Sequence, residues 1–164
     1  MSDLVLMKNI GQLVTPRLAA FSALTAGGSG DNVQVKGVAL DRTSLGNALS
    51  CVVQVATRAV LAATATLSVS GCRLQHANTP VDGDFTDFTT VTVASLTGAT
   101  GGSTETALSL GEIDLTMARR YVRLVYTPDL SASGTDTAQV AAVVVFAGQD
   151  RVASVGHATP ATAY

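Results

Sequence analysis

Apolar and polar residues alternate along the middle of the chain. From Ala63 to Val69 every odd position holds Ala, Leu or Val, and every position between them holds Thr or Ser. A period of two residues is the pattern of a β-strand that buries one face. After Gly71 the apolar residues move to even positions, at Cys72 and Leu74. This change of parity predicts a β-bulge at the glycine.

A polar turn follows this strand. The residues Asn-Thr-Pro-Val-Asp-Gly occupy positions 78–83, and a second β-rich run covers residues 89–96. Two strands joined by a turn with an Asp-Gly step predict a hairpin, here with a long loop from Gln75 to Asp87. Because the flanking strands would hold this loop in place, we interpret it as a candidate for contact with a partner.

Further β-type runs lie on both sides of the hairpin. Residues 138–148 are nearly continuously apolar, as expected of a strand buried on both faces. Turn-forming residues separate the runs at the spacing typical of β-sandwiches. We therefore predict an all-β fold: an antiparallel β-sandwich, jelly-roll-like, with about seven strands. Outside the hairpin, the predicted strands cover residues 33–40, 48–60, 104–115, 120–127 and 138–148.

The two ends of the chain differ from this body. Residues 1–14 include apolar residues without a period, and Thr15-Pro16 suits the start of a short helix. A strand or an extended arm suits the segment after it equally well. Residues 26–32 (AGGSGDN) have the composition of a flexible linker. We predict an N-terminal arm and Gly-rich linker over residues 1–32, a β-sandwich domain over residues 33–152, and a loose C-terminal tail over residues 153–164.

Composition narrows the class of protein. The 164 residues suit one domain with a substantial core, and 47% of them are hydrophobic, which argues against disorder. The formal net charge is −2 and no basic stripe occurs, so we expect no nucleic-acid partner. Only 13% of the residues are charged, which indicates a surface that is partly covered in an assembly. No stretch approaches the roughly 20 apolar residues of a membrane span, and we expect no membrane partner.

Two local observations bear on the compartment. Asp3 and Pro16 interrupt the apolar stretch that a signal peptide needs, so we expect none. Without a sign of secretion, Cys51 and Cys72 are predicted to be buried free thiols rather than a disulfide. They have no CxxC spacing and form no metal-ligand set.

The acidic turn is the best candidate for a chemical site. Asp82, Asp84 and Asp87 lie two and three residues apart, near His76. Carboxylates at such spacing can converge on a hard cation such as Ca²⁺. The pattern lacks the further acid that an EF-hand has at the far end of its calcium-binding loop. We therefore interpret the three as solvated acids of a turn and predict no bound metal.

No catalytic pattern of comparable clarity is present. Glu112 and Asp114 share a strand face, but we expect them to pair with two nearby arginines rather than to act as a hydrolytic pair. No GxSxG motif occurs, and no GK[ST] follows the glycine runs. Tyr121, Tyr126 and Phe146 are expected in the core rather than on a stacking platform. We predict no enzymatic activity, no catalytic residues and no cofactor.

Three segments resemble a known group of proteins. Residues 74–88 (LQHANTPVDGDFTDF), the GATGGST that follows, and residues 118–145 (ARRYVRLVYTPDLSASGTDTAQVAAVVV) are similar to small structural proteins from the head module of tailed bacteriophages. The resemblance covers residues 37–152. Pieces of the hairpin and of the RYVRL strand also resemble discoidin-type sandwiches, which supports the fold.

The resemblance to phage head proteins implies a virion component, specifically a capsid decoration (cement) protein. Such a protein would bind the outer surface of the head and bridge subunits of the major capsid protein. It would be assembled in the host cytoplasm and would cover the capsid surface as a homo-oligomer or in multiple copies. Alternatives are a tail-tube, head-tail connector or fibre-associated virion protein. A carbohydrate-binding module for host attachment is another, and it would need an exposed aromatic pair.

Two regions are expected to contact the capsid. Apolar residues of the predicted arm would gain burial on docking, at roughly 25 cal/mol per Å², less the cost of ordering the arm. The acidic loop would be held ready by the strands beside it. The predicted partner-binding residues are Leu4, Leu6, Ile10, Phe21, Asp82, Asp84 and Asp87.

Overall fold

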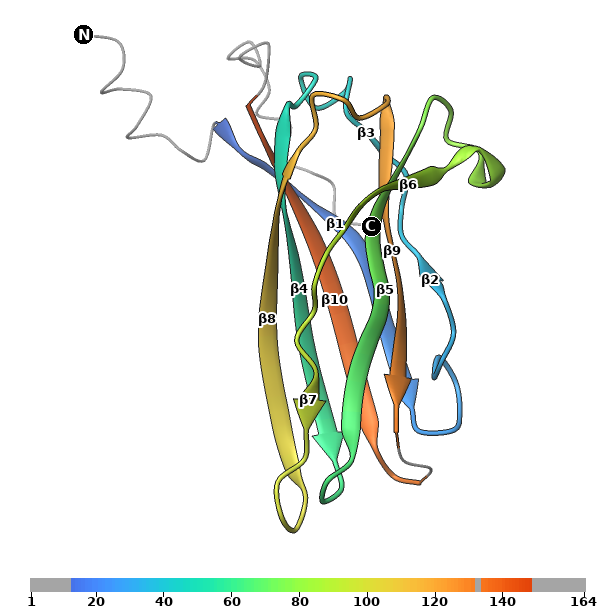
Figure 1. Ribbon diagram of the computed structural model, residues 1–164, viewed down its shortest axis with the longest axis vertical. Helices are drawn as coiled ribbons and strands as arrows, with labels where there is room; N and C mark the ends of the chain where they lie inside the picture. The colour runs from blue at the N-terminus through green and yellow to red at the C-terminus, as the bar shows by residue number, and fades with distance from the viewer. Residues whose placement is uncertain (1–12, 132–133, 149–164) are drawn as a thin grey trace, which may run out of the picture.

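The computed structural model describes residues 13–131 and 134–148, and these form two antiparallel β-sheets that face each other (Figure 1). The prediction of an all-β sandwich is confirmed.

Within the described residues, no helix is long and apolar enough to cross a membrane. Three of the predicted partner-binding residues, Leu4, Leu6 and Ile10, lie outside the described residues, as does the tail predicted for 153–164.

Ten strands and one short 3-10 helix make up the described part of the chain. The runs predicted at 48–60, 104–115, 120–127 and 138–148 all coincide with long strands, because two-residue alternation is a local signal. The run predicted at 33–40 is divided into two short strands. The strands are β1 (Thr15–Thr25), β2 (Val35–Lys36), β3 (Leu40–Asp41), β4 (Ser50–Leu61), β5 (Thr66–Ala77), β6 (Thr86–Thr90), β7 (Leu96–Thr97), β8 (Ser103–Asp114), β9 (Tyr121–Leu130) and β10 (Thr137–Ala147), and the helix is η1 (Asp82–Asp84).

The order of the strands is that of a jelly roll. One sheet has the order β1-β10-β4-β8; the other has β2-β9-β5-β6, with β3 paired to β9 and β7 paired to β5. If β2 with β3, and β6 with β7, are each counted as one interrupted strand, the fold has eight strands. Consecutive strands then lie in opposite sheets, except for β5 and β6, which form a hairpin in one sheet. This is the wrapping of a double Greek key. The predicted jelly-roll-like character is confirmed.

The core fills the space between the two sheets. On β4, residues at alternate positions from Cys51 to Leu61 are buried, as the alternation in sequence requires. Tyr126 of β9 and Phe146 of β10 are fully buried, so both are core residues, as predicted. Leu67 and Leu74 on β5 complete the opposite side of this layer.

The segment at residues 15–25 corrects the predicted arm. It forms β1, which pairs with β10 from Thr15 opposite Phe146 to Thr25 opposite Thr137. Ala19 and Leu24 of β1 are buried in the core. A shift of register after Leu18 places two consecutive alanines inward and breaks the alternation that would have marked the strand. Of the alternatives left open for this segment, the strand is the one observed.

Residues 26–32 were predicted to be a flexible linker, and the structure corrects this as well. The carboxylate of Asp31 accepts hydrogen bonds from the backbone N–H of Gly27, at 2.7 Å, and of Leu130, at 2.8 Å. The backbone N–H of Asn32 donates to the carbonyl of Pro128 at 2.9 Å. These bonds hold the turn against the end of β9. The glycines serve turn geometry here, since Gly27 and Gly30 have positive φ.

Two further predictions are confirmed. Gly71 has φ of +57°, and the register between β5 and β9 shifts between Ser70 and Arg73, so the bulge lies where the parity changed. Cys51 and Cys72 are buried free thiols. Burial raises the pKa of the Cys51 thiol to about 12 and that of Cys72 to about 11.

Candidate interaction surfaces

The loop between β5 and β6 lies over part of the outer face of the β2-β9-β5-β6 sheet, where it contacts Arg123 of β9. Along β9, Val122 and Leu124 point into the core, so Arg123 points outward. It is nevertheless only 7% exposed, because the loop lies over it. Its guanidinium lies 4.1 Å from the ring centroid of Phe85, a cation–π contact. This contact, with the hydrogen bonds from Arg123 to Asp82, anchors the loop to the sheet.

Polar bonds continue from Arg123 in both directions. Its Nε donates to Oε1 of Gln75 at 2.9 Å, and its Nη1 donates to a carboxylate oxygen of Asp82. Nζ of Lys36, on β2, reaches the second oxygen of Asp82 at 2.7 Å. On the other side, Oδ1 of Asp87 accepts from Gln75 Nε2 and from Arg73 Nε, both at 2.7 Å. The result is one chain of hydrogen bonds that runs across β2, β9, β5 and β6.

These bonds change the acidity of the loop. The hydrogen bonds from Lys36 and Arg123 hold the pKa of Asp82 below its usual value. The hydrogen bonds from Gln75 and Arg73 do the same for the pKa of Asp87. Both side chains are largely exposed, so their bonds to the cations are screened by water.

The three acids of the turn do not converge on one point. Asp84 accepts a hydrogen bond from the hydroxyl of Thr79, while Asp82 and Asp87 are bound to different cations. His76 accepts the backbone N–H of Arg119 at its Nδ1, at 3.3 Å, and burial lowers its pKa. Among the residues the structure describes, no group of three His, Cys, Asp or Glu could hold a metal ion.

The pair Glu112 and Asp114 was expected to bind the arginines that follow, and this expectation is wrong. Asp114 accepts hydrogen bonds from the backbone N–H and the hydroxyl of Thr116, at 2.9 and 2.7 Å. Arg120 instead makes a two-bond contact with Asp41, at 3.1 and 2.7 Å. The reason lies in topology: β3 and β9 are neighbours in one sheet, whereas β8 is the edge of the other.

A second surface lies on the outer side of the β1-β10-β4-β8 sheet. Leu18 and Phe21 on β1 are 63% and 58% exposed, and Leu108 and Leu110 on β8 are 61% and 60% exposed. The strand register joins Phe21 to Leu108 through Ala141 and Ala56. It joins Leu18 to Leu110 through Val143 and Gln54. We call this surface the outer apolar face; it consists of Leu18, Phe21, Val52, Ala56, Leu108, Leu110, Ala141, Val143 and Val145.

Of these residues, only Phe21 was among those predicted from the sequence to contact a partner, and its contact role stays a prediction. Phe21 was predicted to contact a partner as part of an arm, and the structure places it on a strand with its ring exposed. The sequence predicted a strand over residues 104–115 that contains Leu108, Leu110 and Ile113, without assigning them to a face. The sequence did contain a sign that Leu108 and Leu110 face outward. They occupy even positions and the buried Ile113 an odd one, so they lie on the opposite face of the strand.

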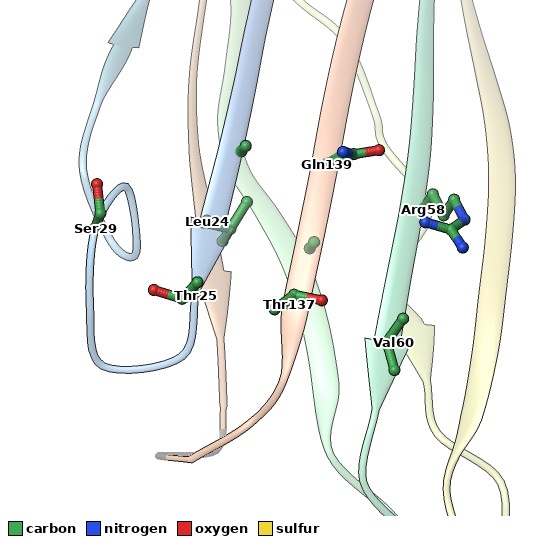
Figure 2. Close-up of a pocket in the computed structure, with 9 residues that line it drawn as sticks. Leu24, Thr25, Ser29, Arg58, Val60, Thr137 and Gln139 are labelled. Carbon is green, nitrogen blue, oxygen red and sulfur yellow. The ribbon is translucent and has the colours of Figure 1, made fainter.

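A pocket of about 380 Å³ is hollowed at one end of this sheet. Figure 2 shows its lining on three neighbouring strands, with Thr25 on β1, Thr137 and Gln139 on β10, and Arg58 and Val60 on β4. Leu24 of β1 and Ser29 of the turn after β1 also line it. Phe21, on β1, and the acidic turn, between β5 and β6, belong to opposite sheets. Of the predicted partner-binding residues that the structure describes, the fold therefore does not bring Phe21 together with the three acids.

The comparisons with known proteins find similarity only among solved structures. No family model matches the chain, and no curated protein matches it. Among solved structures, one similar chain comes from the structure of infectious bursal disease virus, Gx strain, with 11% identity and a TM-score of 0.36. The likeness covers 83% of this chain, which spans 37% of the length of that chain. At this identity and TM-score the likeness carries no argument about the role of this chain.

Proposed function

We propose that this protein is a structural component of a virus particle and that it decorates the capsid. In this role it binds the outer surface of a phage head and bridges neighbouring subunits of the major capsid protein. The sequence resemblance to phage head proteins supports the role. The jelly-roll order of the strands supports it too, since viral capsid domains use this architecture repeatedly.

One observation carries the choice of a binding role: the loop at 78–85 is both exposed and anchored. Val81 is 60% exposed at its tip, while the adjacent Asp82 is fixed to Arg123 and Lys36. A surface that already has its bound shape loses little conformational entropy when a partner docks. The acids of the turn would complement a basic region of the capsid subunit and would steer the encounter.

The experiment uses purified heads that lack the protein. Wild-type protein is added back, co-sedimentation measures its affinity, and electron cryomicroscopy shows its position. We expect density over the outer surface at the junctions between capsid subunits. Density at a vertex or along a tail would contradict the proposal and favour a connector, fibre or tail-tube protein.

A pair of substitutions tests the loop directly. Val81→Lys should weaken binding to heads at least about tenfold, because it places a charge and a longer side chain in the contact. Val33→Lys is the matched control, since Val33 is 54% exposed and precedes β2 near the opposite end of the sandwich. Equal binding by both variants would remove the loop from the contact. Asp82, Asp84 and Asp87 changed together to Asn test the acids in the same assay.

A further inference from the structure

We infer that the outer apolar face is a dimer interface, on which a second copy of this chain docks with the same face. The inference goes beyond attachment to a capsid and concerns the sheet opposite to the anchored loop. Its basis is the combination of an unpartnered apolar sheet face with two opposite charges at complementary positions.

The face has the size that a stable dimer needs. Four strands about 4.8 Å apart, with the eleven residues of β10 rising about 3.4 Å each, give an area of roughly 700 Å² per copy. Specific interfaces bury about 800 Å² per partner. The centre of the face holds Phe21, Ala141, Ala56 and Leu108 in one row of the register, and no charged residue lies in that row.

Arg58 and Glu112 flank this apolar centre. Arg58 lies on β4 and pairs with Thr106; Glu112 lies on β8 and pairs with Val52 of β4. Among the described residues, neither side chain has a hydrogen-bond or ion-pair partner. Figure 2 shows the Arg58 side chain on the side of β4 that faces β8, at the edge of the pocket.

A twofold axis makes these two charges meet. The positions of Arg58 and Glu112 are six residues apart along β4, or about 20 Å. Their midpoint is Val55, whose neighbours Gln54 and Ala56 pair with Leu110 and Leu108. A twofold axis that lies between the facing sheets, perpendicular to the strands at this level, places Glu112 of each copy level with Arg58 of the other.

The same operation fills the centre of the interface. Leu108 and Leu110 of the two copies lie beside the axis and interdigitate. Facing sheets pack about 10 Å apart, a gap that an arginine and a glutamate side chain bridge together. An interface in which the same patch occurs on both partners closes at two copies. The two ion pairs fix the direction in which the strands cross, as charge pairs do at other interfaces.

The test is the mass of the full-length protein in solution, without heads. Sedimentation equilibrium should give twice the chain mass of 16.6 kDa. Arg58→Glu and Glu112→Arg should each raise the dissociation constant at least about tenfold, because each puts like charges together at both ends. The double variant Arg58→Glu with Glu112→Arg should restore the wild-type constant, since it exchanges the charges and recreates both pairs.

A second series tests the apolar centre. Leu108→Lys should give monomers, whereas Met117→Lys, at a position 83% exposed in the turn after β8, should leave the dimer unchanged. Circular dichroism checks that each variant keeps its strands. A monomeric or trimeric wild type, or a double variant as weak as the single ones, would overturn the inference. Because heads are absent, none of these outcomes depends on the proposed attachment to a capsid.

Discussion

Arg123 shows how one residue can link a sheet to the loop above it. Its position on β9 points away from the core, where an arginine would normally reach water. Here the guanidinium has Gln75 and Asp82 as acceptors and packs against the Phe85 ring of the loop. Because the group is buried, loss of Asp82 would leave a desolvated charge without its anion, and loss of Gln75 would leave the Nε–H without an acceptor. This side chain is the buried anchor of the loop, and Lys36, Gln75 and Arg73 add bonds to its acids.

The acids bound to these cations should make stability depend on pH. Asp82 and Asp87 have pKa values below the usual 3.8 when folded, so the unfolded chain binds protons first as the pH falls. Their stabilising effect is therefore complete above about pH 5 and declines as the pH falls towards the folded pKa values. Urea unfolding between pH 7 and pH 3 measures this decline.

The matching variants identify the source of that decline. With Asp82→Asn and Asp87→Asn combined, the free energy of unfolding should fall less steeply between pH 5 and pH 3. Asp129→Asn is the control, because Asp129 lies on the same sheet face with no cation bound to it among the described residues. A slope that stays the same in the combined variant would contradict the assignment to this pair.

At the scale of elements, the bulge in β5 decides which side chains reach the loop. Before Gly71 the strand buries Leu67 and Val69, and after it the buried residues are Cys72 and Leu74. The shifted register also sends Arg73 outward towards Asp87. The glycine is needed because its φ of +57° lies in the left-handed region, where other residues are strained.

Gly71→Ala should therefore lower the free energy of unfolding by about 1 kcal/mol. The added Cβ would also come within 3.1 Å of Nη1 of Arg73 and disturb its bond to the carbonyl of Gly71. Gly83→Ala is the matched control, since a Cβ at Gly83 meets nothing within 4 Å and its φ is ordinary. Urea denaturation compares the two, and equal stability would show that the bulge tolerates a side chain.

At the scale of the whole molecule, β1 is part of the sandwich and also borders the outer apolar face. It closes the open edge of β10 and contributes Leu24 to the core and Phe21 to the surface. The chain before β1 and the strand itself therefore need to be separated in any test of an N-terminal contact. Removal of the strand would expose both an unpaired edge and apolar core surface.

Two truncations make this separation. Removal of residues 1–25 should abolish the cooperative unfolding transition or make the protein insoluble, because burial of Leu24 alone contributes about 2 kcal/mol. Removal of residues 1–12 should keep the transition while it weakens attachment to heads, if Leu4, Leu6 and Ile10 contact the capsid. Thermal unfolding followed by circular dichroism checks the first expectation, and co-sedimentation with heads checks the second. A folded protein without residues 1–25 would contradict the structural role of β1.

The sequence by itself determined the class of fold, most strand positions, the bulge at Gly71 and the placement of Tyr126 and Phe146 in the core. These features rest on local patterns, since alternation and turn residues act over a few neighbouring positions. Only the tertiary structure decided that β1 joins the sandwich, because a register shift hides its alternation. It also decided which sheet each strand enters, and therefore that Leu108 and Leu110 face outward and that Arg123 is covered by a loop. Those outcomes depend on pairing between residues far apart in the chain, which no local pattern contains.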